Sequence, residues 1–137
     1  MLAAARRQGL VAYPLTPSLQ AVLTEVASGH PVLVLQNLSL PFKPMWHYAV
    51  VIGYDPATQK LLLRSGVTER EEMSVSRFLS AWSRADRWAM AVSRADQVPV
   101  SATPHSWIAA LAPFESLGRF GIAETGYHAA AERWPQA

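Results

Sequence analysis

The segment WHYAVVIGYD, residues 46–55, constrains the fold of this chain more than any other stretch. It is rich in β-branched and aromatic residues, and the Asp-Pro pair at its end is typical of a turn. KLLLRSG follows after a five-residue turn, so we expect an antiparallel hairpin in which Tyr54 faces Lys60. A histidine, His47, lies at the start of the first strand, where a core strand does not need an imidazole. The hairpin therefore predicts a sheet with one candidate functional residue at a strand end.

The rest of the first 95 residues predicts further strands and helices around this hairpin. Gly9 and Gly29 are expected to end two helices, Thr16 with Pro17 to start the second, and Ser74 to cap a third. The resulting fold class is α+β, with a mostly antiparallel sheet packed by helices. We expect helices at residues 1–9, 16–29 and 74–82, strands at 31–37, 47–54, 60–66 and 87–92, an extended segment at 10–15 and a polar connection at 67–73.

The composition sets limits on function. Half of the residues are hydrophobic, 16% are charged and the net charge is +2, so a core can form. The arginines are scattered, which is typical of a solvated surface and not of a nucleic-acid interface. No apolar run reaches the roughly 18–20 residues of a membrane span, and residues 1–8 lack the order of a signal peptide. Cysteine is absent, which excludes disulfides, thiolate metal sites and a thiol nucleophile within these residues.

His47 is the candidate catalytic residue. The expected hairpin register places it opposite about Val67, with Ser65 and Gly66 close by, and Asn37 ends the preceding strand. An imidazole there can be oriented by one hydrogen bond while its other nitrogen stays free, as a general base requires. The alternative is a half-buried histidine bonded to a loop carbonyl.

Other chemistries find little support in the sequence. His30, His105 and His128 lie far apart without ligand spacing, so we expect no metal site. No glycine-rich phosphate loop is present, and no cofactor is expected. His30 is expected at the surface, in a turn between a helix and a strand.

Four segments in order resemble one family: HPVLVLQN, WHYAVVIGYD, KLLLRSG and VSRFLSAWSR. Together, over residues 1–92, they resemble the second half of the bacteriocin-processing, double-glycine-type cysteine peptidases, which are papain-like. The resemblance implies a papain-like half-domain at residues 1–95, a peptide or protein substrate, and His47 as the general base that generates a thiolate. The resemblance also implies a periplasmic or membrane-associated location, although these residues carry no signal for one.

Two departures from the family concern catalysis. The family places an aspartate or asparagine at the end of the strand after the histidine, where this chain has Ser65. Ser65 is the nearest match for the residue that orients His47, although it brings no negative charge, and Asn37 is the alternative. The family's upstream Gln…Cys-Gly-Pro segment is also absent. We therefore expect a fragment whose Met1 is internal to a longer reading frame, inactive as it stands.

The C-terminal segment, residues 104–137, follows a Pro-containing linker at residues 96–103 and resembles one tetratricopeptide repeat. Pro113, inside the first helix, and Leu111, where a small residue is usual, depart from the repeat. The alternative is a plain helical hairpin. The resemblance implies a protein partner bound through the repeat. The matching positions are Trp107, Phe114, Gly118, Ala123, Tyr127, Ala130 and Pro135.

Three functions follow as hypotheses. The first is the histidine-bearing part of a papain-like cysteine peptidase that hydrolyses peptide bonds in the full-length protein. The second is a non-catalytic, peptidase-like module that binds peptides or proteins with its helical repeat. The third is an unrelated α+β domain, which a dry, apolar setting around His47 would favour.

Overall fold

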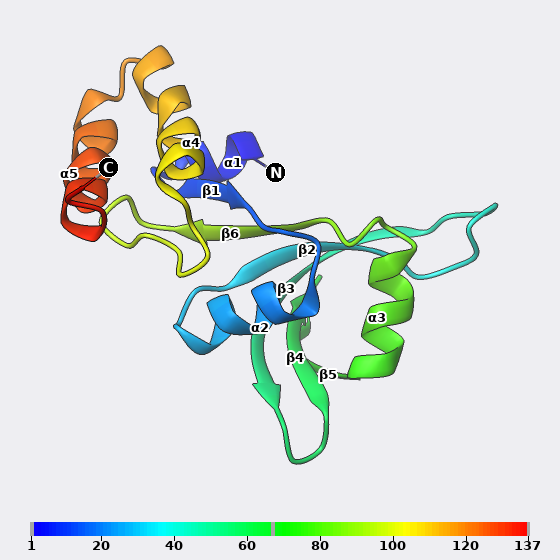
Figure 1. Cartoon of the computed structure of the whole chain (residues 1–137). Coiled ribbons are helices and arrows are strands. Elements are labelled where there is room, and N and C mark those ends of the chain that lie inside the picture. The colour runs from blue at the N-terminus through cyan, green and yellow to red at the C-terminus, as the bar shows by residue number, and fades with distance from the viewer. Residues whose placement is uncertain (1, 67, 137) are drawn as a thin grey trace. The chain divides into compact units, whose positions relative to one another are not determined.

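The structure is a computed structural model that describes residues 2–66 and 68–136. The chain divides into two compact units. We call Pro14–Ala91 the sheet unit, and Met1–Tyr13 with Val92–Ala137 the helical unit. Figure 1 labels the elements of both units along the chain. The domain boundaries expected from the sequence stay a prediction.

The sheet unit contains an antiparallel sheet in the strand order β6-β2-β3-β4-β5. Helices and antiparallel strands are mixed, so the predicted α+β class is confirmed. The predicted strands at residues 31–37, 47–54, 60–66 and 87–92 are all present within one or two residues. The elements are α2 (Leu19–Ala27), β2 (Val32–Asn37), β3 (Trp46–Asp55), β4 (Lys60–Ser65), β5 (Thr68–Ser74), α3 (Val75–Ser83) and β6 (Ala89–Ser93, whose last two residues belong to the helical unit).

The β3–β4 hairpin has a β-bulge that changes its register. Tyr54 pairs with Leu61 and not with Lys60, so the predicted register is wrong by one residue at the tip. Beyond the bulge Val50 pairs with Arg64, which is the pairing that the prediction implies. One extra residue in β3 therefore restores the expected register on the side of the hairpin where His47 lies.

The segment predicted as a polar connection is the edge strand β5 (Thr68–Ser74), so that prediction was wrong. β5 pairs antiparallel with β4, and Met73 opposite Leu61 is its only buried residue. An edge strand with a solvated face can consist largely of charged residues, which hides the usual alternation and discourages pairing with other chains. Val67, the expected partner of His47, lies outside the described residues.

The helix starts follow the hydroxyl caps, with one correction. Ser18, and not Thr16, caps α2, because its side chain accepts a hydrogen bond of 3.1 Å from the Ala21 N–H. Pro17 therefore lies before the helix and not in its first turn. Ser74 caps α3 as predicted by accepting from the Arg77 N–H at 3.3 Å.

The core of the sheet unit is built where α3 packs against the sheet. Phe78 and Trp82 are fully buried, with ring centroids 5.3 Å apart. The Trp82 indole N–H donates a 2.9 Å hydrogen bond to the Trp88 carbonyl, which satisfies its only polar atom. The predicted apolar face of this helix thus anchors it beside the strands.

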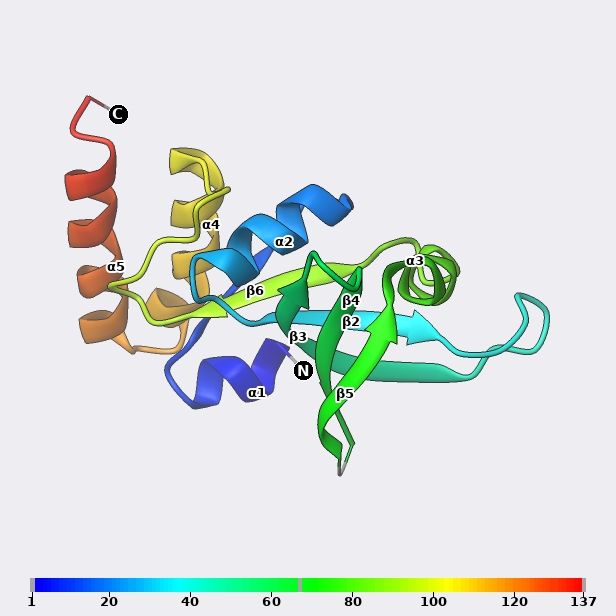
Figure 2. The same cartoon turned by 90° about the horizontal axis from the view of Figure 1, so that it is seen from below.

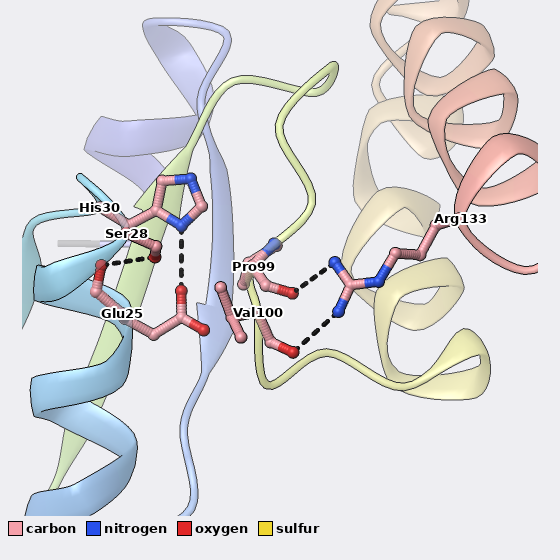
Figure 3. A network of polar contacts seen from close by, with 6 residues as sticks. All are labelled: Glu25, Ser28, His30, Pro99, Val100 and Arg133. Carbon is pink, nitrogen blue, oxygen red and sulfur yellow. Dashed lines mark hydrogen bonds and ion pairs between the residues drawn. The ribbon is translucent and has the colours of Figure 1, made fainter.

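His30 is a correction to the sequence analysis. It is not a surface residue, since its side chain is only 13% exposed and its Nδ1 lies 2.9 Å from Oε2 of the fully buried Glu25 (Figure 3). The Glu25 backbone carbonyl also accepts from the Ser28 hydroxyl at 2.8 Å. A buried carboxylate requires such partners, so the end of α2 is fixed by a polar contact.

The helical unit contains α1 (Leu2–Arg7), β1 (Val11–Pro14, whose last residue belongs to the sheet unit), α4 (Pro104–Ser116) and α5 (Phe120–Arg133). Helices α4 and α5 lie side by side as a hairpin (Figures 1 and 2). Gly118 occupies their turn with φ of +75°, which glycine adopts without strain. No helix in the described part of the chain is long and apolar enough to cross a membrane.

The α4–α5 contact explains one departure from the repeat pattern. Gly126 leaves room for the buried Leu111, whose Cδ2 would lie 2.4 Å from a Cβ at position 126. The Trp107 indole donates a 3.0 Å hydrogen bond to the Gly126 carbonyl. A large residue on α4 is thus matched by the smallest residue on α5. Helix α4 continues three residues past Pro113.

Residues before α4 are tied to α5. The Arg133 guanidinium donates to the carbonyls of Pro99 and Val100 at 3.3 and 2.8 Å (Figure 3). Thr103 caps α4 by accepting from the Ser106 N–H at 3.3 Å. The segment expected as a linker therefore has fixed contacts within the helical unit.

Candidate functional site

His47 lies at the second position of β3, where its ring is half-buried. Its Nε2 forms a hydrogen bond with the Ser65 hydroxyl. Among the described residues no hydrogen bond to its Nδ1 is formed. One ring nitrogen is therefore held by a hydrogen bond, and the described residues supply no partner for the other.

The sheet register explains why these two residues meet. Val51 pairs with Leu63, and residues two apart on a strand lie on the same face. His47 therefore shares a face with Val51, and Ser65 shares it with Leu63. Because β4 ends at Ser65, its hydroxyl projects beside the start of β3.

The tautomer of His47 decides what this contact can do. If Ser65 accepts from Nε2–H, the lone pair is on Nδ1, which can then accept a proton. If Ser65 donates to Nε2, then Nδ1 carries the hydrogen and cannot act as a base. His47 can therefore act as a base only in the first tautomer.

Asn37 is not brought to His47. Its Oδ1 accepts from the backbone N–H groups of Ser39 and Met45 at 3.0 and 2.9 Å, and its Nδ2 donates to the Leu40 carbonyl at 3.4 Å. It also pairs across strands with Trp46, so its side chain lies on the opposite face from His47. The structure therefore uses this asparagine to hold the loop between β2 and β3.

Gln36 is a neighbour of His47 that sequence reasoning missed. It pairs directly with His47 across β2 and β3, which places both side chains on one face. Only 1% of Gln36 is exposed, and its Nε2 donates to the weak acceptor Sδ of Met73 at 3.5 Å. The signal in the sequence is a polar residue that follows four apolar residues in a buried strand.

The residues present limit the chemistry of the site. None of the 137 residues is cysteine, so they supply no thiol. No group of three or more His, Cys, Asp or Glu side chains that could hold a metal ion is found in residues 2–66 and 68–136. What the site offers is an oriented imidazole next to a hydroxyl.

Comparison with known proteins assigns the fold to a family. The sequence profile of the Peptidase_C39 like family matches residues 8–90, more than half of the chain. A Bacillus anthracis protein, described in its crystal structure as a C39-like peptidase, matches with a TM-score of 0.51 and 19% identity. The match covers 65% of this chain and 54% of that protein, so the chain spans about half of the length of that relative. No curated protein sequence matches.

These matches exclude one of the three hypotheses. The family profile includes His47 and Ser65, and an unrelated α+β domain is therefore wrong. The profile ends at residue 90, so the tetratricopeptide likeness of residues 104–137 stays a prediction. From its sequence profile and its papain-like arrangement of helices and antiparallel strands, this chain belongs to the Peptidase_C39-like family.

Proposed function

We propose that this chain is the histidine-bearing part of a bacterial papain-like cysteine peptidase of the bacteriocin-processing type. In this proposal it acts with a thiol that lies outside these 137 residues. One observation carries the proposal: the His47 ring is held at Nε2 by Ser65, while Nδ1 has no hydrogen-bond partner among the described residues. These 137 residues contain no cysteine, so they do not supply the thiol of this reaction.

His47 would act as base and then as acid. Its Nδ1 takes the proton from the thiol, and the thiolate attacks the carbonyl carbon of the scissile peptide bond. The imidazolium then gives this proton to the leaving amine, and water hydrolyses the thioester. Ser65, by accepting from Nε2–H, keeps the lone pair on Nδ1. Since a hydroxyl carries no negative charge, it stabilises the imidazolium less than a carboxylate would.

The substrate in this proposal is a peptide that contains a double-glycine cleavage site. The helical hairpin at residues 104–137 would hold a protein partner, as a tetratricopeptide repeat does. No cofactor takes part, because the imidazole and the thiol carry both proton transfers.

The tautomer of His47 tests the first step on the chain in hand. Long-range ¹⁵N–¹H NMR correlations at neutral pH distinguish a protonated Nε2 from a protonated Nδ1. We expect hydrogen on Nε2 and a lone pair on Nδ1. Hydrogen on Nδ1 would show that Ser65 donates to the ring and that His47 is not a poised base.

Hydrolysis itself is tested on the product of the entire open reading frame that encodes this chain. We expect cleavage of a reporter peptide after Gly-Gly, and at least about a hundredfold lower kcat for His47→Ala, since base catalysis contributes at this scale. His105→Ala is the matched control, because His105 lies on α4. An entire product that contains cysteine but leaves the peptide intact would contradict the proposal.

A second candidate is favoured by the lack of cysteine: a non-catalytic peptidase-like module that binds peptides or proteins. It is supported if the entire product also lacks cysteine, leaves peptides intact and binds the Gly-Gly peptide in calorimetry. His47→Ala should then leave the affinity unchanged, because in this second candidate function the helical repeat holds the peptide.

A further inference from the structure

The loop between β2 and β3 exposes a row of apolar side chains. We call residues 38–46 the apolar finger. Figures 1 and 2 both show the loop extending beyond the sheet, past the end of α3. Phe42, near its tip, is 83% exposed, which is unusual for a phenylalanine. The exposed apolar residues of the finger are Leu38, Leu40, Phe42, Met45 and Trp46.

The finger is held in shape by hydrogen bonds. Asn37, buried at its base, uses its side chain for the three contacts to Ser39, Leu40 and Met45 described above. The Leu38 N–H also donates to the Met45 carbonyl at 2.9 Å. The apolar side chains are therefore presented by an ordered loop that the fold maintains.

A basic hollow adjoins the base of the finger. It has a volume of about 270 Å³. Arg77 and Arg84 are seven residues apart on or just after α3, which places both on one side of the helix. No ion pair is formed by either guanidinium with a described residue, although the Arg84 Nε donates to the Asn37 carbonyl at 3.0 Å. The hollow is lined by Leu38, Met73, Ser76, Arg77, Ser80, Ala81 and Arg84.

The charged side chains of the finger and of the lining of the hollow are all cationic. Residues 38–46 include Lys43 and no carboxylate, and the lining of the hollow includes no carboxylate either. Cationic and hydroxyl groups can bind the lipid phosphates at the surface of a bilayer, and an apolar projection beside them can enter the hydrocarbon region. Trp46 stands at the base of the finger, where an amphipathic ring lies well at a membrane–water interface.

We infer that the apolar finger and the basic hollow dock this chain onto an anionic lipid bilayer. Phe42 and its apolar neighbours enter the interface, and Lys43, Arg77 and Arg84 contact lipid phosphates. A projecting finger with an 83% exposed tip suits a deformable lipid layer better than a rigid protein surface, which would have to be hollowed to receive it. This inference goes beyond the proposed function and does not depend on His47.

Vesicle flotation tests the inference. The full chain is mixed with vesicles of phosphatidylglycerol and phosphatidylcholine, or of phosphatidylcholine alone. We expect preferential binding to the anionic vesicles that weakens at high salt. Phe42→Ser should weaken it at least about tenfold through lost apolar burial, and Arg77→Gln about fivefold through one lost phosphate contact.

Matched variants control for exposure and charge elsewhere. Phe120→Ser removes an aromatic side chain that is 65% exposed on α5, and Arg70→Gln removes an exposed arginine on β5. Both variants should bind the anionic vesicles like wild type. His47→Ala should do so too, which separates this inference from the proposed peptidase chemistry. Binding to neutral and anionic vesicles alike, or equal losses in the control variants, would overturn the inference. A dimer in analytical ultracentrifugation that Phe42→Ser dissociates, without vesicle binding, would assign the finger to a second copy instead.

Discussion

The sheet unit and the helical unit bury their aromatic residues in different ways. In the sheet unit Phe78 and Trp82 lie on one stripe of α3 and cover the sheet. In the helical unit Trp107 of α4 is buried and reaches the backbone of α5 at Gly126. The sheet is covered by the broad apolar face of α3, whereas the helical hairpin brings the large Leu111 against Gly126. Mutations should therefore damage the two units by different mechanisms.

The largest effect is expected in the core of the sheet unit. Phe78→Ala removes a fully buried ring, which should lower the free energy of unfolding by about 3–5 kcal/mol. Phe42→Ala is the matched control, since its ring is 83% exposed and the change should stay within about 0.5 kcal/mol. Urea denaturation followed by far-UV circular dichroism measures both. Similar losses in the two variants would mean that α3 does not anchor this core.

The next effect concerns overpacking in the helical unit. Gly126→Ala places a methyl group within 2.4 Å of Leu111, and should cost about 1–3 kcal/mol although alanine favours helices. Gly121→Ala, on the same helix with nothing within 4 Å, should instead stabilise by up to about 1 kcal/mol. Thermal melts compare the two variants. A lower melting temperature for Gly126→Ala and a higher one for Gly121→Ala would support the close fit of Leu111 against Gly126. Higher melting temperatures for both variants would refute it.

A smaller effect is expected at His47. Ser65→Ala removes the partner of Nε2 and should cost about 1 kcal/mol, and it should release the ring into a mixture of tautomers. Ser76→Ala, an exposed serine on α3, serves as the control. The ¹⁵N shifts of the His47 ring provide the readout. Unchanged shifts in Ser65→Ala would mean that the hydroxyl does not orient the ring.

The smallest effect is a pH dependence in the helical unit. Burial and, next, the Glu115 carboxylate raise the pKa of the Tyr127 phenol above its ordinary value of about 10. The unfolded chain then loses this proton at lower pH than the folded chain. Stability should thus be full below about pH 10 and fall as the pH rises toward the raised pKa. Ultraviolet titration at alkaline pH should show Glu115→Gln lowering the pKa of Tyr127, while Glu124→Gln serves as the control.

Much of the fold could be predicted because its signals are local. A strand shows its branched residues, and a cap such as Ser74 acts on a backbone group three residues away. The same local reasoning misplaced the start of α2, where Thr16 and Ser18 both offer a hydroxyl. It also missed β5, because a strand made of charged residues shows its role only through the pairing of Met73 with Leu61.

The candidate site could be predicted in part. His47 and its contact with Ser65 follow from a hairpin register that a bulge shifts and then restores. The choice between Ser65 and Asn37 needed the structure, since both end strands beside His47. Gln36 could not be found, because its nearness to His47 depends on how β2 aligns with β3.

The sequence alone determined the fold class, the histidine at a strand end and the lack of a thiol. Each depends on composition or on neighbours within a few residues, where the backbone fixes the geometry. The tertiary structure decided which hydroxyl or amide reaches His47, why Leu111 is tolerated beside Gly126, and that Asn37 supports a projecting loop. These depend on register and on packing between distant segments, and a shift of one residue turns a side chain to the opposite face of a sheet.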